Sequence, residues 1–316
     1  MTSSIKVGIS SCLLGQRVRY DGGDKRSALC IDELGQLFDL VPTCPEAGAG
    51  LGVPRPPVRL VGDADAPRAR GIDNPALDVT DRLQSYASAR VPELAELCGY
   101  VFIRNSPSCG LFDVKLHAED GTLLEATSRG IFASAFVSAY PALPVEEEGR
   151  LHEAGVRENF ITRVHAMHEW RQLRRAGFST AALTQFHARY KYTLMAQSLP
   201  HYRALGRMLG SASTEAIELL AERYFTALME GLGHQATRGS HTNVLMHLQG
   251  YLKKHLGAGD KQALADLIDR YRLGLAPLAA PIQLLRQHFA DHPDPYIAQQ
   301  VYLHARTDAA RQEIQP

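Results

Sequence analysis

The first 140 residues of this 316-residue chain alternate short apolar runs with amphipathic stretches. The apolar runs predict strands at residues 6–11, 38–43, 100–104 and 113–117. Apolar residues spaced three and four apart predict helices at 31–38, 81–97 and 130–139. Strand–helix alternation is typical of a Rossmann-like, mostly parallel sheet with helices on both faces. We therefore predict an α/β N-terminal domain.

After Pro141 and Pro144 the strand signals stop and helical spacing takes over. It predicts helices at 157–175, 181–197, 213–230, 242–256 and 261–273. Ser213 is the expected N-cap of the third of these helices. The acidic run Glu146–Glu148 lies near this change and is taken as a boundary mark. We predict an α/β domain over residues 1–142 and an all-α domain over residues 143–316.

The charged residues balance overall but not between the two parts of the chain. Residues 1–145 carry 14 Lys and Arg against 17 Asp and Glu, and residues 146–316 carry 20 against 17. This mild basic shift is compatible with a polyanionic partner but does not establish one. The N-terminus lacks the pattern of an export signal, and no apolar stretch is long enough to span a bilayer. With an odd number of cysteines, five, we expect a cytoplasmic protein without a membrane partner.

Three cysteines, Cys12, Cys44 and Cys109, each follow a predicted strand. Because ligands bind beyond the carboxyl ends of parallel strands, we expect the three thiols at one edge of the sheet. Their spacings of 32 and 65 residues provide no CxxC hook of the kind that structural zinc sites use. An iron–sulfur cluster with one open iron therefore fits better than zinc with a water. Cys30 and Cys98 are expected to be buried, apolar residues of helices.

Polar residues suited to acid–base chemistry lie beside two of these cysteines. Glu46 stands two residues after the second cysteine, in CPEAGAGLGVPRPP. In the same segment Gly48 would allow an anionic substrate to approach the backbone. Ser106 and Ser108 precede the third cysteine in NSPSC. Ser106 is either a catalytic hydroxyl or a turn residue that bonds its own backbone.

The segment after the first cysteine, CLLGQRVRYDGGDKR, concentrates charge and glycine. The substrate-binding candidates in it are Arg19, Tyr20, Asp21 and Gly22, and Gly48 and Ser108 of the other two motifs join them. An arginine suits a phosphate and a tyrosine can stack on a base. The alternative interpretation is a loop whose charges are solvated.

These motifs resemble two known families. SSCLLGQRVRYDGG, CPEAGAGLGVPRPP and NSPSCG resemble the thiouracil desulfidase family over about residues 5–140. VEEEGRLHEAGVRENF, FHARYKYTLMAQS and NVLMHLQGYLKK resemble the helical YbgA-type family over residues 146–316, although Gln197 stands where histidine is common there. The fused pair resembles the RudS-type desulfidases, which remove sulfur from 4-thiouridine in transfer RNA (tRNA).

The resemblance implies a cofactor and a catalytic set. It implies that Cys12, Cys44 and Cys109 bind a 4Fe–4S cluster whose open fourth iron takes the sulfur of the substrate. It also implies that Glu46 and Ser106 are catalytic. Our hypothesis is that Glu46 deprotonates an attacking water which Ser106 orients, so that thiouridine and water give uridine and hydrogen sulfide. No redox partner is required.

The C-terminal domain is the expected tRNA-binding part. Asn243, His247, Gly250 and Lys254 recur on one face of the helix predicted at 242–256, opposite Val244, Leu248 and Tyr251. The other RNA-binding candidates are His187, Lys191, Arg238 and Lys253. A solvated polar face on a structural helix explains this pattern equally well.

Two other functions stay open at this stage. One is the same chemistry on free 2-thiouracil or on thiolated nucleotides. The other is a non-catalytic iron–sulfur module that binds RNA. The sequence leaves the oligomeric state open.

Overall fold

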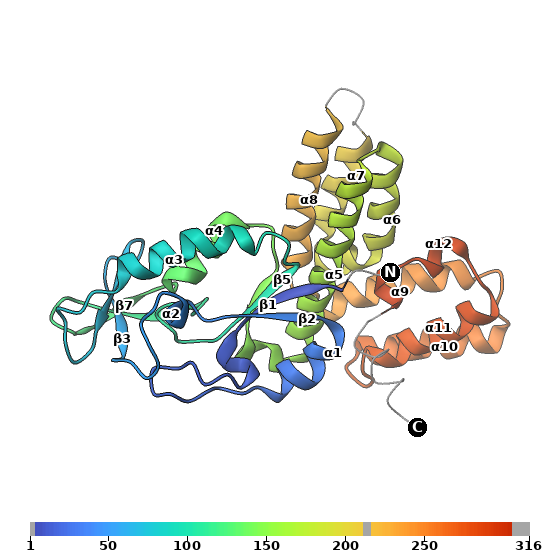
Figure 1. The fold of residues 1–316 in the computed structure, drawn as a ribbon. Coiled ribbons are helices and arrows are strands. Elements are labelled where there is room, and N and C mark those ends of the chain that lie inside the picture. Colours follow the sequence, from blue (N-terminus) through green and yellow to red (C-terminus); the bar gives the residue numbers. More distant parts are fainter. Residues whose placement is uncertain (1–3, 211–215, 305–316) are drawn as a thin grey trace. The chain divides into compact units, whose positions relative to one another are not determined.

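The computed structural model describes residues 4–210 and 216–304 and divides the chain into two compact units, Met1–Glu169 and Trp170–Pro316. In the part described, every strand belongs to the first unit, and the second unit consists of helices (Figure 1). The predicted order, an α/β part followed by an all-helical part, is confirmed.

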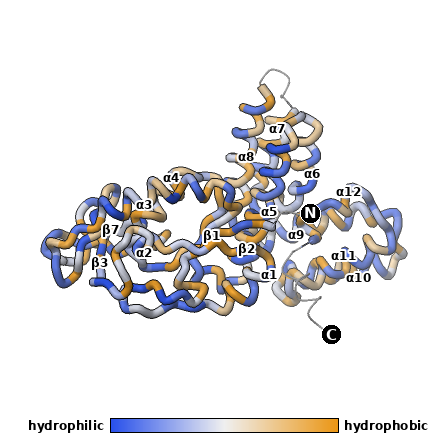
Figure 2. Tube along the Cα trace, in the orientation of Figure 1, coloured by the Kyte–Doolittle hydropathy of each residue, from blue (hydrophilic) through white to orange (hydrophobic). Residues whose placement is uncertain are grey.

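A four-stranded parallel sheet organises the first unit. Its strand order is β2 (Asp39–Thr43), β1 (Lys6–Ser10), β5 (Gly99–Phe102) and β8 (Val145–Glu147). All of β5, and all of β1 except Lys6, is buried, in keeping with the hydrophobic colour along β1 in Figure 2. The predicted strands at 6–11, 38–43 and 100–104 are confirmed. β8 corrects the prediction that strands stop before the acidic run.

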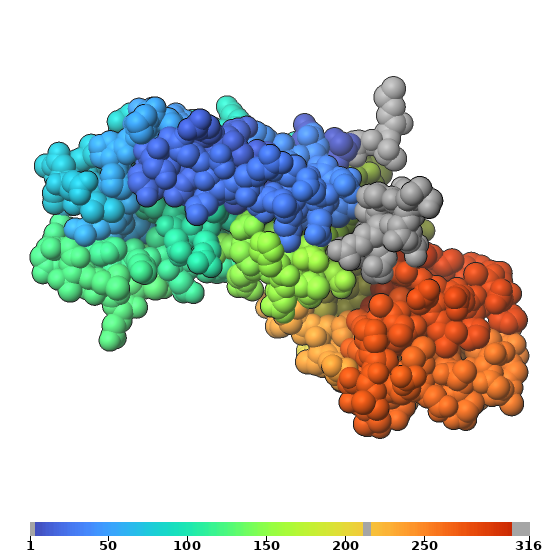
Figure 3. Space-filling model, turned by 90° about the horizontal axis from the view of Figure 1, so that it is seen from below, coloured from blue at the N-terminus to red at the C-terminus, as the bar shows by residue number. Residues whose placement is uncertain are grey.

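A second, mixed sheet was not predicted. Its order is β4 (Pro67–Gly71), β3 (Val58–Gly62), β6 (Val114–His117) and β7 (Leu123–Ser128), with β3 and β6 parallel and the outer pairs antiparallel. The strand predicted at 113–117 exists, but it joins this sheet. β4, with the sequence PRARG, carries two arginines that pair with Asp78 at the surface, so its pattern did not indicate a strand. On the surface of the first unit, the blue N-terminal residues lie beside the green residues near 120 (Figure 3).

Helices cover the sheets and supply the aromatic core of the first unit. They are η1 (Ser11–Leu14), the π-helix η2 (Leu29–Leu34), α1 (Gly35–Leu37), α2 (Pro45–Gly48), α3 (Thr80–Glu93), α4 (Ile131–Ala139), η3 (Glu148–His152) and α5 (Ala154–Ala176), whose last residues belong to the second unit. Tyr100 and Phe102 of β5 pack against Phe136 of α4, with ring centroids 4.9 and 6.0 Å apart. This contact fixes α4 against β5. Cys30 of η2 and Cys98 are buried, as expected, but Cys98 lies between α3 and β5 rather than in a helix.

The second unit is built from α6 (Thr180–Gln197), α7 (Leu199–Gly210), α8 (Ile217–Gly233), α9 (Arg238–Leu252), α10 (Ala258–Arg272), α11 (Ala279–Asp291), α12 (Pro295–Ala298) and η4 (Val301–Leu303). Trp170 stacks on Phe225 of α8 with ring centroids 4.5 Å apart. All five predicted helices are present, whereas α7 and α11 were missed; Ser213 lies outside the described residues. Of the helices described here, none is long and apolar enough to cross a membrane.

Candidate active site

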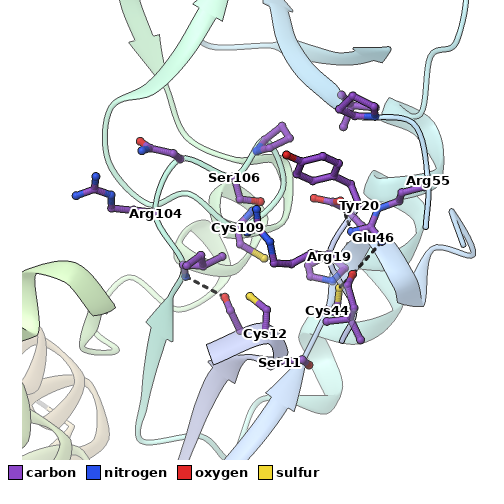
Figure 4. Close-up of a pocket in the computed structure, with 18 of the residues that line it drawn as sticks. Ser11, Cys12, Arg19, Tyr20, Cys44, Glu46, Arg55, Arg104, Ser106 and Cys109 are labelled. Carbon is purple, nitrogen blue, oxygen red and sulfur yellow. Dashed lines mark hydrogen bonds and ion pairs between the residues drawn. The ribbon is translucent and has the colours of Figure 1, made fainter. Parts of the chain in front are cut away.

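A cavity of about 230 Å³ lies at the carboxyl ends of β1, β2 and β5, and Cys12, Cys44 and Cys109 line it. Cys12 lies in η1 directly after β1, Cys44 is the N-cap residue of α2 directly after β2, and Cys109 lies in the turn after β5. Their side chains project into the same space (Figure 4). The expectation that the three thiols meet at one edge of the sheet is confirmed.

The Cys109 turn is held by the first turn of α4. Ile131 and Phe132 donate their backbone N–H groups to the carbonyl oxygens of Pro107 and Ser108, each at 3.0 Å. Helix N-termini leave such N–H groups without intrahelical partners, so the turn satisfies the helix while the helix fixes the turn. Gly130 is required here because an added Cβ would lie 2.6 Å from the Ser108 carbonyl carbon.

All three thiols are free, and burial raises the pKa of each one. Cys12 reaches a pKa of about 11, and the pKa of Cys109 rises well above its ordinary value. Burial dominates the raised pKa of Cys44, but the backbone N–H groups of Ala47 and Glu46 bond to its sulfur and lower that pKa. The Ser10 hydroxyl similarly lowers the pKa of Cys109 against the effect of burial.

The donor set fits an iron–sulfur cluster better than a single ion. Within residues 4–210 and 216–304, no three ligands lie close enough to hold one metal ion. A tetrahedral zinc about 2.3 Å from each sulfur would bring the sulfurs to about 3.8 Å from one another. A cluster binds each thiolate through a different iron, which separates the sulfurs further. Soft sulfur donors that accept hydrogen bonds are also the usual surroundings of such clusters.

Glu46, the predicted base, is clamped on both sides. Its Oε2 accepts from Arg55 Nε at 2.8 Å and from Arg55 Nη2 at 2.5 Å, an ion pair in which the two side chains are only 14% and 5% exposed. Its Oε1 accepts from the Ser108 hydroxyl at 2.9 Å. A carboxylate offers about two acceptor positions on each oxygen, so Oε1 keeps one position free. The clamp therefore selects Oε1 as the atom that can take a proton.

The structure separates the two serines that precede Cys109, and Ser106 has the turn geometry that the sequence offered as one of its two interpretations. Ser106 lines the cavity, and its Oγ accepts from the backbone N–H groups of Ser108 at 3.2 Å and Cys109 at 3.0 Å. Ser106 is thus a turn-forming residue whose hydroxyl proton is not used in these two bonds. Ser108 is completely buried and contacts Glu46 from behind the cavity wall.

Of the substrate-binding candidates, Arg19 and Tyr20 line the cavity, and Tyr20 is 43% exposed. Asp21 and Gly22 form the adjoining turn instead: Asp21 Oδ1 accepts from the Gly23 N–H, and Gly22 adopts a left-handed φ of 77°. Gly48 lies outside the cavity lining and faces α3, where an added Cβ would lie 2.2 Å from the Tyr86 ring. We correct the substrate-binding assignments of Asp21, Gly22, Gly48 and the fully buried Ser108 accordingly.

The sequence analysis missed Arg55, Ser10 and Arg104. Arg55 lies in the quoted CPEAGAGLGVPRPP segment, nine residues after Glu46, and also donates to the Val18 carbonyl at 2.9 Å. It thereby ties the carboxylate to the segment that carries Arg19. Arg104 lines the cavity mouth but points away from the three cysteines (Figure 4).

The RNA-binding candidates of the second unit occupy varied environments. His187 Nδ1 lies 3.1 Å from the Tyr224 hydroxyl, and burial, followed by the charge of Lys191, lowers its pKa to about 4. Its ring is therefore neutral near pH 7 and adds no positive charge to the predicted RNA-binding set. The Lys191 ammonium lies 5.0 and 5.6 Å from the ring centroids of Tyr192 and Tyr296.

Arg238 and the residues of α9 complete this set. Arg238 Nη1 donates to the Tyr271 carbonyl at the end of α10, at 2.7 Å, so this residue has a structural role. Asn243, His247 and Gly250 are exposed as predicted. Exposed residues past the end of α9 are Lys253, its C-cap, and Lys254 in the following turn. The buried side is confirmed for Val244 and Leu248, whereas Tyr251 is 38% exposed.

The fold and the cavity define an α/β thiol-pocket domain joined to a helical domain. Residues 7–148 match the family model described as 2-thiouracil desulfurase, and residues 191–305 match one described as a protein of unknown function (DUF1722). The chain is 36% identical over 146 residues to the uncharacterized protein YbgA of Escherichia coli (strain K12), covering 46% of this chain and 86% of that protein. The chain therefore belongs to the YbgA family, and it combines a YbgA-type domain with a 2-thiouracil desulfurase domain.

A solved structure is also similar to part of the chain. It is described as a 4Fe–4S-dependent thiouracil desulfidase, TudS, and is 27% identical with a TM-score of 0.38. The match covers 47% of this chain and 94% of that one.

Proposed function

We propose that this protein is a non-redox desulfidase that depends on a 4Fe–4S cluster bound by Cys12, Cys44 and Cys109. The observation that carries the proposal is the meeting of three free thiols with a clamped carboxylate, Glu46, around one cavity. The match of residues 7–148 to the 2-thiouracil desulfurase model supports it. When bound, the cluster would supply a soft Lewis acid suited to a thiocarbonyl sulfur.

The residues of the chain supply the acid–base chemistry. Glu46 Oε1 takes a proton from a water as that water attacks the thiocarbonyl carbon of the base. The Ser106 hydroxyl faces the cavity and orients the water. The proton then passes from Glu46 to the departing sulfur, and the hydroxyl proton of the tetrahedral intermediate follows it as the carbonyl forms, so thiocarbonyl and water give carbonyl and hydrogen sulfide. Atoms balance without any electron donor or acceptor, and no redox partner is needed.

We propose 4-thiouridine in tRNA as the substrate. At about 230 Å³, the cavity is smaller than the about 300–1,000 Å³ of pockets for drug-sized ligands, and under the proposal it would hold the cluster as well, so it suits a single base rather than several nucleotides. A base in folded RNA would have to leave its stack to enter such a cavity. Tyr20 at the cavity mouth offers a stacking surface, and Lys191, Asn243, His247, Lys253 and Lys254 are the proposed RNA contacts. The family description favours free 2-thiouracil as the second candidate substrate.

One experiment tests both the chemistry and the substrate. The protein is reconstituted anaerobically with iron and sulfide and incubated separately with thiolated tRNA and with free 2-thiouracil. Sulfide release and nucleoside mass spectrometry then follow the loss of the thiocarbonyl. Loss of 4-thiouridine supports the tRNA proposal, and sulfide from the free base alone supports the second candidate. RNA binding without sulfide release from either substrate would leave only a non-catalytic module.

Replacement of the proposed base gives the sharpest variant. Glu46→Gln keeps the shape of the side chain and should lower turnover roughly a hundred- to ten-thousand-fold, the usual contribution of general base catalysis. Iron content should stay at the parent value because Glu46 is not a cluster ligand. Glu119→Gln is the matched control, since Glu119 pairs with Arg70 at the surface of the second sheet. Parent-like turnover in Glu46→Gln would refute the assignment.

A further inference from the structure

The acidic run Glu146–Glu148 lies in and directly after β8, not in a linker. β8 pairs in parallel with β5, the strand that leads into the Cys109 turn. Glu147 is only 7% exposed although it carries a carboxylate. Burying a charge is costly unless hydrogen bonds compensate for it, so its contacts decide why it is there.

Glu147 holds the segment that follows Cys109. Its Oε1 accepts from the backbone N–H groups of Leu111 at 2.9 Å and Phe112 at 3.1 Å. These residues come two and three positions after the cysteine, while the first turn of α4 bonds the carbonyl oxygens on its other side. The Cys109 segment is therefore held at its N–H groups by Glu147 and at its carbonyl oxygens by α4.

Glu148 holds the other end of the Cys12 loop. Its Oε1 accepts from the Ser27 hydroxyl at 2.7 Å, across 121 positions of sequence. The Ser27 N–H donates to the Leu13 carbonyl at 2.9 Å, and the Lys25 N–H donates to the Cys12 carbonyl at 3.0 Å. These two backbone bonds close the loop that begins at Cys12, and the hydrogen bond to Glu148 holds Ser27 at its end.

We propose that Glu147 and Glu148 are positioning residues that hold the Cys109 and Cys12 segments in place before any cluster is present. Neighbouring residues of one chain segment thereby set the positions of two thiols that lie 97 residues apart in the sequence (109 − 12). The inference rests on the proposed function only in taking these thiols as cluster ligands. Glu147 holds the segment because its Oε1 accepts the two backbone hydrogen bonds, and its negative charge contributes less than these bonds.

The test measures thiol reactivity in the metal-free, full-length protein. Each cysteine is labelled with a maleimide under native conditions, and mass spectrometry gives a separate rate for Cys109. Glu147→Ala removes both hydrogen bonds to a charged acceptor and should speed this labelling about tenfold or more. Glu147→Gln keeps an acceptor oxygen and should stay within about twofold of the parent rate. Asp120→Ala is the control, since Asp120 accepts from the Thr122 N–H in an exposed turn.

A second readout follows anaerobic reconstitution with iron and sulfide. Glu147→Ala should lose iron to a chelator about tenfold faster than the parent and show an altered electron paramagnetic resonance signal after reduction. Glu147→Gln should restore both properties. Parent-like Cys109 labelling in Glu147→Ala would overturn the proposal. So would equal labelling in Glu147→Gln and Glu147→Ala, because charge would then matter more than the acceptor.

Ser27→Ala keeps the proposal testable if Glu147→Ala does not fold. It removes the hydroxyl that donates to Glu148 at 2.7 Å and accepts from the Cys30 N–H at 3.3 Å, and it should speed labelling of Cys12 while leaving that of Cys109 unchanged. Parent-like Cys12 labelling would overturn the role of Glu148. A parent protein that holds a cluster but releases no sulfide would refute the proposed function and leave this inference intact. The two ideas therefore fail by different measurements.

Discussion

Ser108→Ala is the most informative substitution at the site, because it removes one hydrogen bond and no cavity-lining atom. The Ser108 hydroxyl is buried and donates to Glu46 Oε1 at 2.9 Å. Hydrogen bonds to charged groups contribute about 1.5–3 kcal/mol. Each 1.36 kcal/mol lost from transition-state stabilisation slows a reaction tenfold, so kcat should fall roughly ten- to 150-fold. KM should change little, because Ser108 does not contact the substrate.

The assay is anaerobic sulfide release at varied substrate concentration, with iron measured on the same sample. Ser128→Ala is the matched control, since the Ser128 hydroxyl donates to the Ala64 carbonyl in the second sheet at 2.7 Å. The reasoning fails if kcat of Ser108→Ala stays within about twofold of the parent value, below what one such bond contributes. It also fails if kcat falls only in proportion to lost iron, because Ser108 would then support the Cys109 turn rather than Glu46.

Three further perturbations give distinct outcomes. Arg55→Lys replaces a two-point contact with Glu46 by a single one and should lower kcat about tenfold at unchanged iron content, as steady-state kinetics would show. Gly130→Ala places a Cβ 2.6 Å from the Ser108 carbonyl carbon and should abolish cluster binding, which an iron assay checks; a full iron content would contradict this. Burial lowers the pKa of His241 to about 4 from 6.5, so the unfolded chain binds this proton more tightly. Between pH 6.5 and pH 4 this histidine should lower the free energy of unfolding by about 3 kcal/mol, as calorimetry would show. In His241→Gln this contribution of about 3 kcal/mol should be missing.

The positions of the three cysteines could be predicted because three strongly apolar runs precede them. The segments around β1, β2 and β5 have no competing helical pattern, and adjacent parallel strands end at the same edge. The second sheet could not be predicted in the same way. Its outer strands β4 and β7 carry charged residues that pair or lie at the surface, so the apolar pattern of a strand is weak there. Their pairing depends on contacts between distant segments, which no local pattern encodes.

The different roles of Ser106 and Ser108 could not be predicted from their spacing in the sequence. Both hydroxyls precede Cys109 within one turn, and only the direction of each side chain separates them. The turn draws Ser106 Oγ onto two backbone N–H groups and leaves Ser108 facing Glu46. Arg55 was overlooked for a related reason: its chain returns to Glu46 through a loop whose path the sequence alone does not reveal. The acidic run was misread because a three-residue strand gives little signal.

In the strand order β2–β1–β5, the three thiols come together only after distant strands have paired, so a cofactor could be inserted only after folding. No pair of the three thiols comes together until strands from distant parts of the chain have paired, so a nascent, unfolded chain offers no cluster site. This differs from small zinc domains, in which metal binding and folding are one event. Under the proposed function, a cluster would enter a domain that has already folded, through the cavity that the three thiols line. Under the proposed function, loss of a cluster to oxygen would then leave these strands paired, and the same chain would be reloaded without resynthesis.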